Sequence, residues 1–426
     1  MNRNVKLHPL LSALTWDVIF VWAISTMFLT NQKGLSYAQT ISLDSILMLS
    51  GAIMCIPVQR IFQNVKSITA LRVGLLGYAV FILLNIFGES YFVFALAQPF
   101  LSFGYVLIAV KINGLLTESL HHVGRSKEFE KISGKGLSLY YVLECVGAIF
   151  ITYVYNWNPY SAFWVSFAII IFAVAYTFLF KEPSKFQEKN INIDSKTMPK
   201  KTIKKPDSYF KIATMGFFLA LLVYALLFRG IASITTSSYK IYLDQLVNQK
   251  AIPVWLFGYL FALARLATAI STKYQFKFSL KFGVRSLIII NVFLICAFIV
   301  NGVLYIYNPT NIVCMVVIII LCCILTALRT PNQIFINNYM QVCMPTRNME
   351  RAYAIKVTME YLGYGLISML YAGLLAFFKD DWGVTNLVYI AIVAVPLIIS
   401  MIVFIRALCK KHAQKYTVIK DEYTID

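Results

Sequence analysis

Seven charged side chains lie inside long apolar runs of this sequence. They are Asp17, Lys111, Glu144, Arg229, Arg265, Arg329 and Glu360. A charge at the centre of a bilayer costs about 2.5–3.5 kcal/mol on insertion scales, so it is normally paired or wetted. Buried carboxylates take up protons more readily, and arginines can hold a carboxylate or phosphate through two parallel hydrogen bonds. These residues are candidates for proton transfer and anion binding, with structural ion pairing as the alternative.

The composition identifies the kind of protein that must position these charges. Of the 426 residues, 59% are hydrophobic and 13% are charged, and the mean hydropathy is +0.71. Soluble domains contain about a quarter charged residues. The apolar residues also gather into runs of the length that crosses a bilayer, which is about 20 residues. The sequence therefore predicts a membrane protein.

Each run is predicted to be a helix, because lipid offers no hydrogen-bond partners to the backbone and a barrel would show short alternating segments. Twelve transmembrane helices are expected in this all-α, polytopic protein. Their predicted limits are 9–30, 41–62, 71–88, 91–117, 136–156, 161–180, 209–236, 253–272, 286–306, 311–340, 353–377 and 384–408.

One connector is long and polar. Residues 181–208 read KEPSKFQEKNINIDSKTMPKKTIKKPDS, which is rich in lysine, interrupted by proline and unable to bury a core. This predicts a six-helix bundle in residues 1–180, a cytoplasmic basic linker in 181–208, a second six-helix bundle in 209–408, and a cytoplasmic tail in 409–426.

The distribution of lysine and arginine predicts the orientation, since short cytoplasmic loops carry the positive excess. One set of connectors contains Lys66 and Arg72; Arg125, Lys127, Lys131 and Lys135; the linker lysines; Lys273, Lys277, Lys281 and Arg285; and Arg347 and Arg351. The other set contains little beyond Lys33, Lys240, Lys250 and Lys379. Both termini are therefore predicted to be cytoplasmic. Cations flanking spans also explain the net charge of +19 as contact with anionic headgroups of membrane lipids, without nucleic acid.

The sequence lacks the residue patterns that metal binding, nucleotide hydrolysis and serine-type catalysis require. The eight cysteines show no paired metal-ligand spacing, and the four histidines lie outside the predicted spans. No phosphate-binding GxxxxGK[ST] motif and no Ser/His/Asp set are present. We expect neither an enzyme nor a metal or cofactor site.

Two short matches indicate that the halves repeat. The motif E-x-x-G occurs at Glu144–Gly147 and again at Glu360–Gly363, in the fifth and eleventh spans. Asn64–Ser67 corresponds in the same way to Gly283–Ser286, each in a basic turn that leads into the next span. Both pairs are separated by about half the chain, as a duplication requires.

With these features the sequence resembles the major facilitator superfamily of secondary transporters over essentially its whole length. The resemblance includes GLSYAQ at 34–39 and KFGVRS at 281–286. It implies conformational gating turns formed by Gln59, Arg60, Lys66, Gly283 and Arg285. Gln59 stands where the family usually has aspartate, which brings an inter-bundle lock based on that aspartate into doubt.

The resemblance also implies that spans 1, 4, 7 and 10 line a central cavity, that spans 2, 5, 8 and 11 flank it, and that spans 3, 6, 9 and 12 face lipid. All seven charges fall on the inner spans. Asp17 and Lys111 would lie on neighbouring cavity helices, about 15 and 9 Å from the cytoplasmic ends at 1.5 Å per residue, where direct contact is expected.

Several roles remain open. Glu144 and Arg265 could form a structural pair between the bundles or a substrate or proton site. Glu360 could couple protons or be only the repeat partner of Glu144, and Arg229 could simply snorkel to the membrane surface. Arg329 lies where Pro331 could kink its helix and free carbonyl groups for a ligand. The aromatic residues near these sites, which could stack on a ring or only pack, are Trp16, Trp22, Tyr140 and Tyr141.

The sequence is interpreted as a secondary active transporter that moves a small organic solute by alternating access, coupled to protons. Four cations against three carboxylates slightly favour an anionic or carboxylate-bearing substrate. An exporter or flippase of amphiphilic molecules, lipid-linked molecules or drugs is one alternative, although the fifth span lacks the glycine-proline pair of many drug exporters. A non-transporting sensor or scaffold is another. Composition favours a bacterial cytoplasmic membrane, and a monomer is expected.

Overall fold

The first predicted span is not one helix. In the computed structural model, α1 (Asn2–Thr15) ends before Trp16, and α2 (Val21–Met27) begins after a non-helical turn and continues into a π-helical stretch, η1 (Phe28–Gln32). Phe20, in this turn, has φ +76°, in the left-handed region that a side chain with a Cβ seldom adopts. The span predicted at 9–30 is therefore present but discontinuous.

The structure describes all residues except 63, 126–127, 183–207, 309–310, 344–348 and 413–426. The helices that follow the first span in the first half are α3 (Tyr37–Phe62), α4 (Ser67–Phe87), α5 (Tyr91–His122), α6 (Phe129–Trp157) and α7 (Pro159–Thr177). Those of the second half are α8 (Tyr209–Ala213), α9 (Gly216–Asn248), α10 (Val254–Phe282), α11 (Arg285–Tyr307), α12 (Ile312–Cys343), α13 (Met349–Phe377) and α14 (Trp382–His412).

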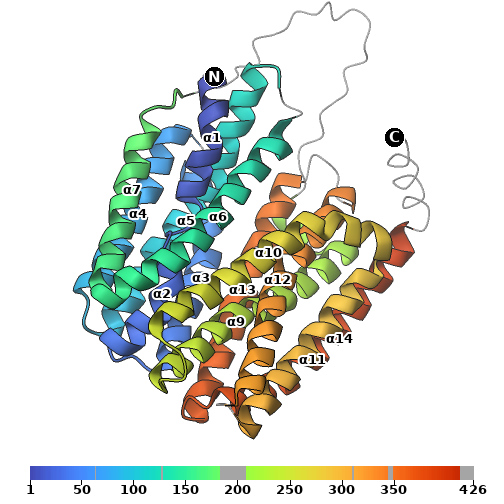
Figure 1. Ribbon diagram of the computed structural model, residues 1–426. Coiled ribbons are helices and arrows are strands. Elements are labelled where there is room, and N and C mark those ends of the chain that lie inside the picture. The colour runs from blue at the N-terminus through green and yellow to red at the C-terminus, as the bar shows by residue number, and fades with distance from the viewer. Residues whose placement is uncertain (63, 126–127, 183–207, 309–310, 344–348, 413–426) are drawn as a thin grey trace, which may run out of the picture.

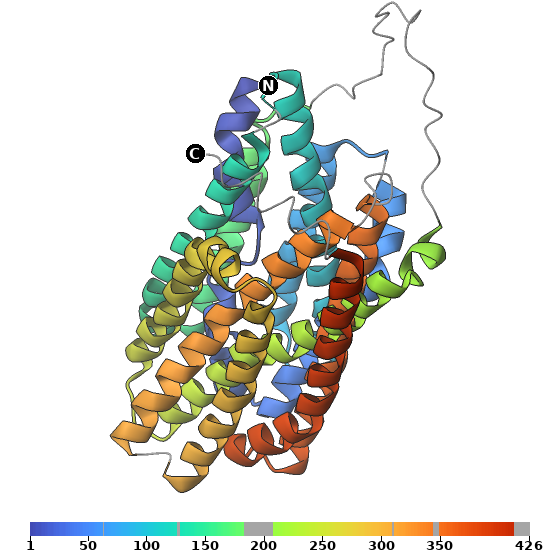
Figure 2. The same ribbon diagram turned by 90° about the vertical axis from the view of Figure 1, so that its right-hand side faces the viewer.

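Eleven helices in the described part of the chain are long and apolar enough to cross a membrane. The interrupted first span completes twelve crossings, and no strand occurs among the described residues. The predicted fold class, two six-helix bundles in an all-α membrane protein, is confirmed. Figure 1 shows α1 to α7 on one side and α9 to α14 on the other, and in Figure 2, turned by 90°, the second half lies in front of the first.

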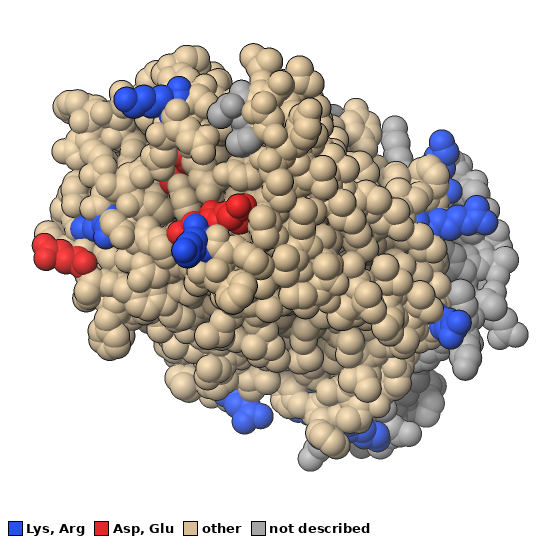
Figure 3. All heavy atoms as spheres, turned by 90° about the horizontal axis from the view of Figure 1, so that it is seen from below, with Lys and Arg blue, Asp and Glu red and all other residues tan. Residues whose placement is uncertain are grey.

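Helix α1 begins and α14 ends at the same end of the molecule, the upper end in Figure 1. We call this end the terminal face, and the other end, with the turns at 33–36, 249–253 and 378–381, the opposite face. Figure 3 views the opposite face, where charged side chains are few and an acidic group lies near the middle.

The ends of the predicted linker and tail can be compared with the structure only in part. Lys181 and Glu182 still belong to the first bundle, because the Lys181 amide donates to Asn4 Oδ1 at 3.1 Å and the Glu182 carboxylate accepts from the backbone amides of Ser67 and Ile68. Helix α14 continues to His412. Residues 183–207 and 413–426 lie outside the described residues, so the boundaries of the predicted units stay predictions.

The two E-x-x-G motifs occupy equivalent places. A Cβ on Gly147 of α6 would overlap the Phe20 ring of the broken first span. A Cβ on Gly363 of α13 would overlap the Leu226 carbonyl of α9. In each half the motif's glycine therefore lets its helix approach the first helix of that half closely, and the glutamate lies one turn away.

Candidate functional site

The break in the first span is held by side chains of neighbouring helices. Backbone groups in a membrane interior must find partners within the protein. Tyr78 of α4 donates its hydroxyl to Thr15 O at 3.4 Å, and Ser166 of α7 donates to Ile19 O at 2.8 Å. The amide of Val18 donates to Asp17 Oδ1 at 2.7 Å. These hydrogen bonds stabilise the turn, which places Asp17 inside the bundle.

Asp17 is surrounded by neutral donors. The hydroxyl of Tyr105 on α5 donates to its Oδ1, and that of Tyr140 on α6 to its Oδ2 at 3.5 Å. Within the described chain, no lysine or arginine lies within ion-pair distance of this carboxylate. Asp17 does interact electrostatically with Glu144 and Arg265, which places it beside their pair.

Glu144 and Arg265 form an ion pair across the two halves. Arg265 Nε lies 3.0 Å from Glu144 Oε1, and both side chains are largely buried. The Arg265 guanidinium also lies over the Phe261 ring, 4.7 Å from its centroid. The expected meeting of these two residues is confirmed, and the pair joins α6 to α10. Whether it also serves substrate or protons stays a prediction.

Sequence reasoning missed Lys240. The seventh span was expected to end at residue 236, but α9 continues to Asn248, so Lys240 is inside the protein and only 4% exposed. Its Nζ donates to Ser25 Oγ at 3.2 Å and lies 4.6 Å from the Trp22 ring centroid. It also interacts electrostatically with Asp44, and more weakly with Asp17, Glu144 and Arg265. Trp22 thus serves as the platform for a buried cation.

Helix α9 carries a polar stripe, which we call the α9 stripe. It consists of Arg229, Ser233, Ser237, Lys240 and Asp244, spaced three or four residues apart and so on one helix face. Ser237 donates to Asp44 Oδ2 at 2.9 Å, while Lys240 contacts α2. The α9 stripe therefore faces the first half. This spacing was the available signal for the longer helix.

Asp244 ends the α9 stripe near the opposite face. It is fully buried and accepts hydrogen bonds from Thr30 at 2.9 Å, Asn31 at 3.2 Å and Tyr37 at 3.0 Å. We call Asp244 with these three donors the Asp244 hub. Because all three donors belong to the first half, the hub ties the two halves together at this end.

Lys111 does not reach Asp17. Its Nζ donates to Phe62 O at 2.6 Å and Val65 O at 3.1 Å, where α3 ends, and Asp17 is bonded elsewhere. The expected contact between Lys111 and Asp17 is wrong. The free carbonyl groups at the end of α3 attract the Lys111 ammonium, and the spacing along the sequence gives no sign of this contact.

Glu360 has a partner that sequence reasoning also missed. Lys356 Nζ lies 2.8 Å from Glu360 Oε1, one turn away on α13, and both side chains are buried. The i, i+4 spacing was the signal for this pair. Arg229 and Arg329, by contrast, have no carboxylate within ion-pair distance in the described chain, and they interact electrostatically with each other.

The predicted gating turns and aromatic residues are placed as follows. In the first half, Gln59 Nε2 lies 3.7 Å from Cys55 Sγ on its own helix, Arg60 lies over the Tyr209 ring, and Lys66 directly precedes α4. In the second half, Gly283 has φ +51° and Arg285 is the first residue of α11. Trp16 is 47% exposed, with its ring centroid 6.2 Å from that of Tyr140, and Tyr141 follows at 5.3 Å from Tyr140. Their gating and binding roles stay predictions.

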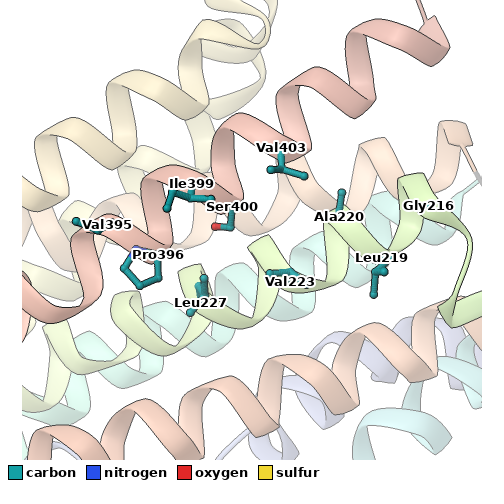
Figure 4. A pocket seen from close by; sticks show the side chains of 10 residues that line it. All are labelled: Gly216, Leu219, Ala220, Val223, Leu227, Val395, Pro396, Ile399, Ser400 and Val403. Atoms are coloured by element: carbon teal, nitrogen blue, oxygen red, sulfur yellow. The ribbon is translucent and has the colours of Figure 1, made fainter.

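A separate apolar groove lies on the outer side of α9. It has a volume of about 530 Å³ and runs between α9 and α14 (Figure 4). Its walls include Leu219, Val223 and Leu227 of α9 and Val395, Ile399 and Val403 of α14. The groove carries no charged side chain and lies on the other side of α9 from Arg229, since residues two apart on a helix point in nearly opposite directions.

Two helical halves with a repeated motif and twelve crossings are the architecture expected of the major facilitator fold. The chain is a multi-pass membrane protein with this fold, as its resemblance predicted. No family model and no curated protein matches the sequence.

Solved structures do match. A mutant of the nucleoside transporter NupG aligns with a TM-score of 0.75 and 13% identity, covering 94% of this chain and 100% of that one. A D-xylose-proton symporter gives 0.69 and 11%, covering 94% and 97%. A bacterial homologue of the human lysosomal transporter Spinster, inward-facing and unoccupied, gives 0.64 and 13%, covering 95% and 94%. At these identities the likeness shows the fold alone.

Proposed function

We propose that this protein is a secondary active transporter that moves a small organic solute by alternating access and couples this movement to protons. The structural neighbours are a nucleoside transporter, a D-xylose-proton symporter and a Spinster homologue, which supports the transporter class. In such a fold the two halves rock about a site at mid-membrane depth. The terminal face is proposed to be cytoplasmic, in a bacterial cell membrane, with the protein working as a monomer among its lipids.

The observation that carries the proposal is Asp17 at the break of the first span. Among the carboxylates predicted as coupling sites, Glu144 and Glu360 are in ion pairs, whereas Asp17 is held by tyrosine hydroxyls and a backbone amide. A carboxylate without a cation in a buried place takes up a proton more readily. Protonation would remove its charge beside the Glu144–Arg265 pair, which joins the halves, and so change their relative stability.

The arginines distinguish this proposal from a sensor or scaffold that has lost transport. Such a protein needs its buried charges only for structure, so each should be in a tight pair. Arg229 and Arg329 are not, within the part of the chain that the structure describes. Their charge also supports the slight preference for an anionic or carboxylate-bearing solute. The apolar groove of Figure 4 is separated from them by α9 itself, which gives no support to a flippase.

Replacing Asp17 tests the coupling. In proteoliposomes with an imposed pH gradient, we expect Asp17→Asn to abolish gradient-driven accumulation of nucleosides, pentoses or organic anions, whichever the wild type accumulates. Exchange of labelled for unlabelled solute, which needs no net proton movement, should persist.

Glu144→Gln and Glu360→Gln give the comparison, and Glu89→Gln, at an exposed position of the opposite face, is the control. Accumulation by all three amide variants at Asp17, Glu144 and Glu360, at the wild-type level, would show that none of these carboxylates couples protons.

A further inference from the structure

Arg229 and Arg329 are partly buried cations, and the described part of the chain places no carboxylate within ion-pair distance of either. Glu144 forms an ion pair with Arg265, and Glu360 forms one with Lys356. Arg229 Nε is buried without a hydrogen-bond partner. An arginine in such a place forgoes its hydration without gaining a carboxylate, so the arrangement is costly unless a ligand completes it.

The two arginines lie at the same depth on adjacent helices. Asn332 of α12 donates to the Tyr224 hydroxyl of α9 at 2.8 Å, which fixes the two helices level at that point. Arg229 is five residues beyond Tyr224 and Arg329 three residues before Asn332, both toward the opposite face. At 1.5 Å per residue these steps are about 7.5 and 4.5 Å, so the two side chains begin within about 3 Å of the same level.

A second tie supports this alignment. Cys323 Sγ of α12 contacts the Tyr239 hydroxyl of α9 at 3.8 Å. Arg229 lies between Tyr224 and Tyr239 on α9, and Arg329 lies between Cys323 and Asn332 on α12. The two ties therefore bracket both arginines on these two helices.

Both arginines also face the space between the halves. Arg229 belongs to the α9 stripe, whose other members contact the first half. Arg329 interacts electrostatically with Arg229, with Arg265 and with Tyr141 of the first half. Tyr364 of α13 interacts with both arginines. The surroundings therefore combine positive charge with neutral tyrosines.

We propose that Arg229 and Arg329 together bind the oxyanion of the transported solute, a phosphate or carboxylate group. Two guanidinium groups at one level can each donate two hydrogen bonds to such a group, and the bound charge removes their mutual repulsion. The inference rests on the proposed transport function, which it makes specific for oxyanion-bearing solutes. Because α9 also carries the Asp244 hub, ligand bound at Arg229 would act on the helix that ties the halves together.

Direct binding tests this without transport. Purified protein in uncharged detergent is titrated with inorganic phosphate, succinate and glucose 6-phosphate at constant ionic strength, and the thermal midpoint is followed, because a ligand stabilises the state that binds it. Glucose is the matched neutral probe. We expect at least one oxyanion to raise the midpoint saturably and glucose to have a smaller effect or none.

The variants locate the effect. Arg229→Gln and Arg329→Gln should each weaken oxyanion binding on the order of tenfold or more, the loss of one charge-assisted contact. Without ligand they should be at least as stable as the wild type, since a like-charge repulsion is removed. Arg229→Lys and Arg329→Lys keep the positive charge but lose the forked hydrogen-bond geometry of the guanidinium group, so they should weaken binding less than the glutamine variants do. Arg406→Gln, at an exposed arginine of α14, should bind as the wild type does.

Three results would overturn the inference: no response to any oxyanion, an equal response in all variants, or lower stability of both glutamine variants without ligand. Displacement of the soluble probes by phosphatidylglycerol but not by one another would assign the site to a lipid headgroup instead. Intact oxyanion binding in a protein that transports nothing would contradict the proposed transport function, while Arg229 and Arg329 would still form an oxyanion-binding site.

Discussion

Glu144 and Asp17 are neighbouring carboxylates in different situations. Glu144 is 3.0 Å from Arg265, while Asp17 is held by Tyr105 and Tyr140. Removing one partner of a buried pair leaves the other charge uncompensated, which is more costly than the pair is stabilising. The same amide substitution should therefore affect stability at Glu144 and coupling at Asp17.

We expect Glu144→Gln to lower the free energy of unfolding by on the order of 3–5 kcal/mol, because Arg265 remains buried and charged. The double variant Glu144→Gln/Arg265→Gln should recover part of this loss. Thermal midpoints of the purified variants provide the measurement.

The control is Glu128→Gln, which breaks the exposed pair with Arg125 and should leave the midpoint unchanged. A Glu144→Gln protein as stable as the wild type would mean that Arg265 finds another partner or water.

At the residue scale, the sequence indicated which charges are buried but not all of their partners. Glu144 with Arg265 followed from the resemblance, because their helices meet in the implied fold. Lys240 and Lys356 were missed: the predicted seventh span ends at residue 236, before Lys240, and Lys356, inside the predicted eleventh span, was not counted among the charges. Asp17 does not contact Lys111, because the Lys111 side chain points toward the end of α3. The spacing of residues along the sequence does not give this direction.

At the scale of the element, the broken first span depends on Gly147. Phe20 occupies the space where any side chain at position 147 would lie, and its own backbone is in the left-handed region. Such a conformation persists only where the surroundings hold it. The turn that carries Asp17 is therefore positioned by the contact of Phe20 with α6.

We expect Gly147→Val to displace the Phe20 ring, cost about 1–3 kcal/mol through overpacking, and reduce transport more than it reduces stability. The thermal midpoint and the rate of solute exchange are both measured. Adding Phe20→Ala to Gly147→Val should restore part of the stability.

Gly373→Val is the matched control, because a Cβ there meets nothing within 4 Å. Equal effects at positions 147 and 373 would show that the loss comes from helix propensity and not from the contact with Phe20.

The sequence predicted eleven of the spans as helices that the structure shows, but not the interruption of the first. The stretch Thr15 to Phe20, TWDVIF, contains neither glycine nor proline, so no local signal for a break exists. The break is stabilised instead by Tyr78 and Ser166, which lie far away in the sequence. The length of α9 could have been predicted, since the α9 stripe keeps its helical period through Asp244.

At the scale of the whole molecule, the halves are tied at three depths. The Asp244 hub joins them near the opposite face, and Glu144 with Arg265 joins them within the membrane. Near the terminal face, the Arg60 guanidinium of the first half lies 5.8 Å from the Tyr209 ring centroid of the second. When the two halves rock, the contacts between them at one face must break, while the Glu144–Arg265 pair within the membrane can remain.

We expect Asp244→Asn to loosen the opposite face, because an amide cannot accept from three donors as a carboxylate does, at a cost of about 1–3 kcal/mol. The measurement uses Ser25→Cys, buried behind the hub beside Lys240, in a Cys296→Ser background that removes an exposed thiol. An impermeant maleimide should label this cysteine faster in the Asp244→Asn variant, when added to intact cells from the side of the opposite face.

Glu89→Gln, on the same face, should not change the labelling rate. Unchanged labelling in Asp244→Asn would show that the Asp244 hub does not hold this face closed.

The break in the first span also bears on how the protein enters the membrane. The first span carries Asp17 near its middle, which costs about 2.5–3.5 kcal/mol in the insertion step. The tyrosines that compensate this charge come 88 and 123 residues later in the chain. We therefore expect the first span to gain its compensating contacts only after α5 and α6 have been synthesised, so that insertion of this half is cooperative and not a succession of independent insertions.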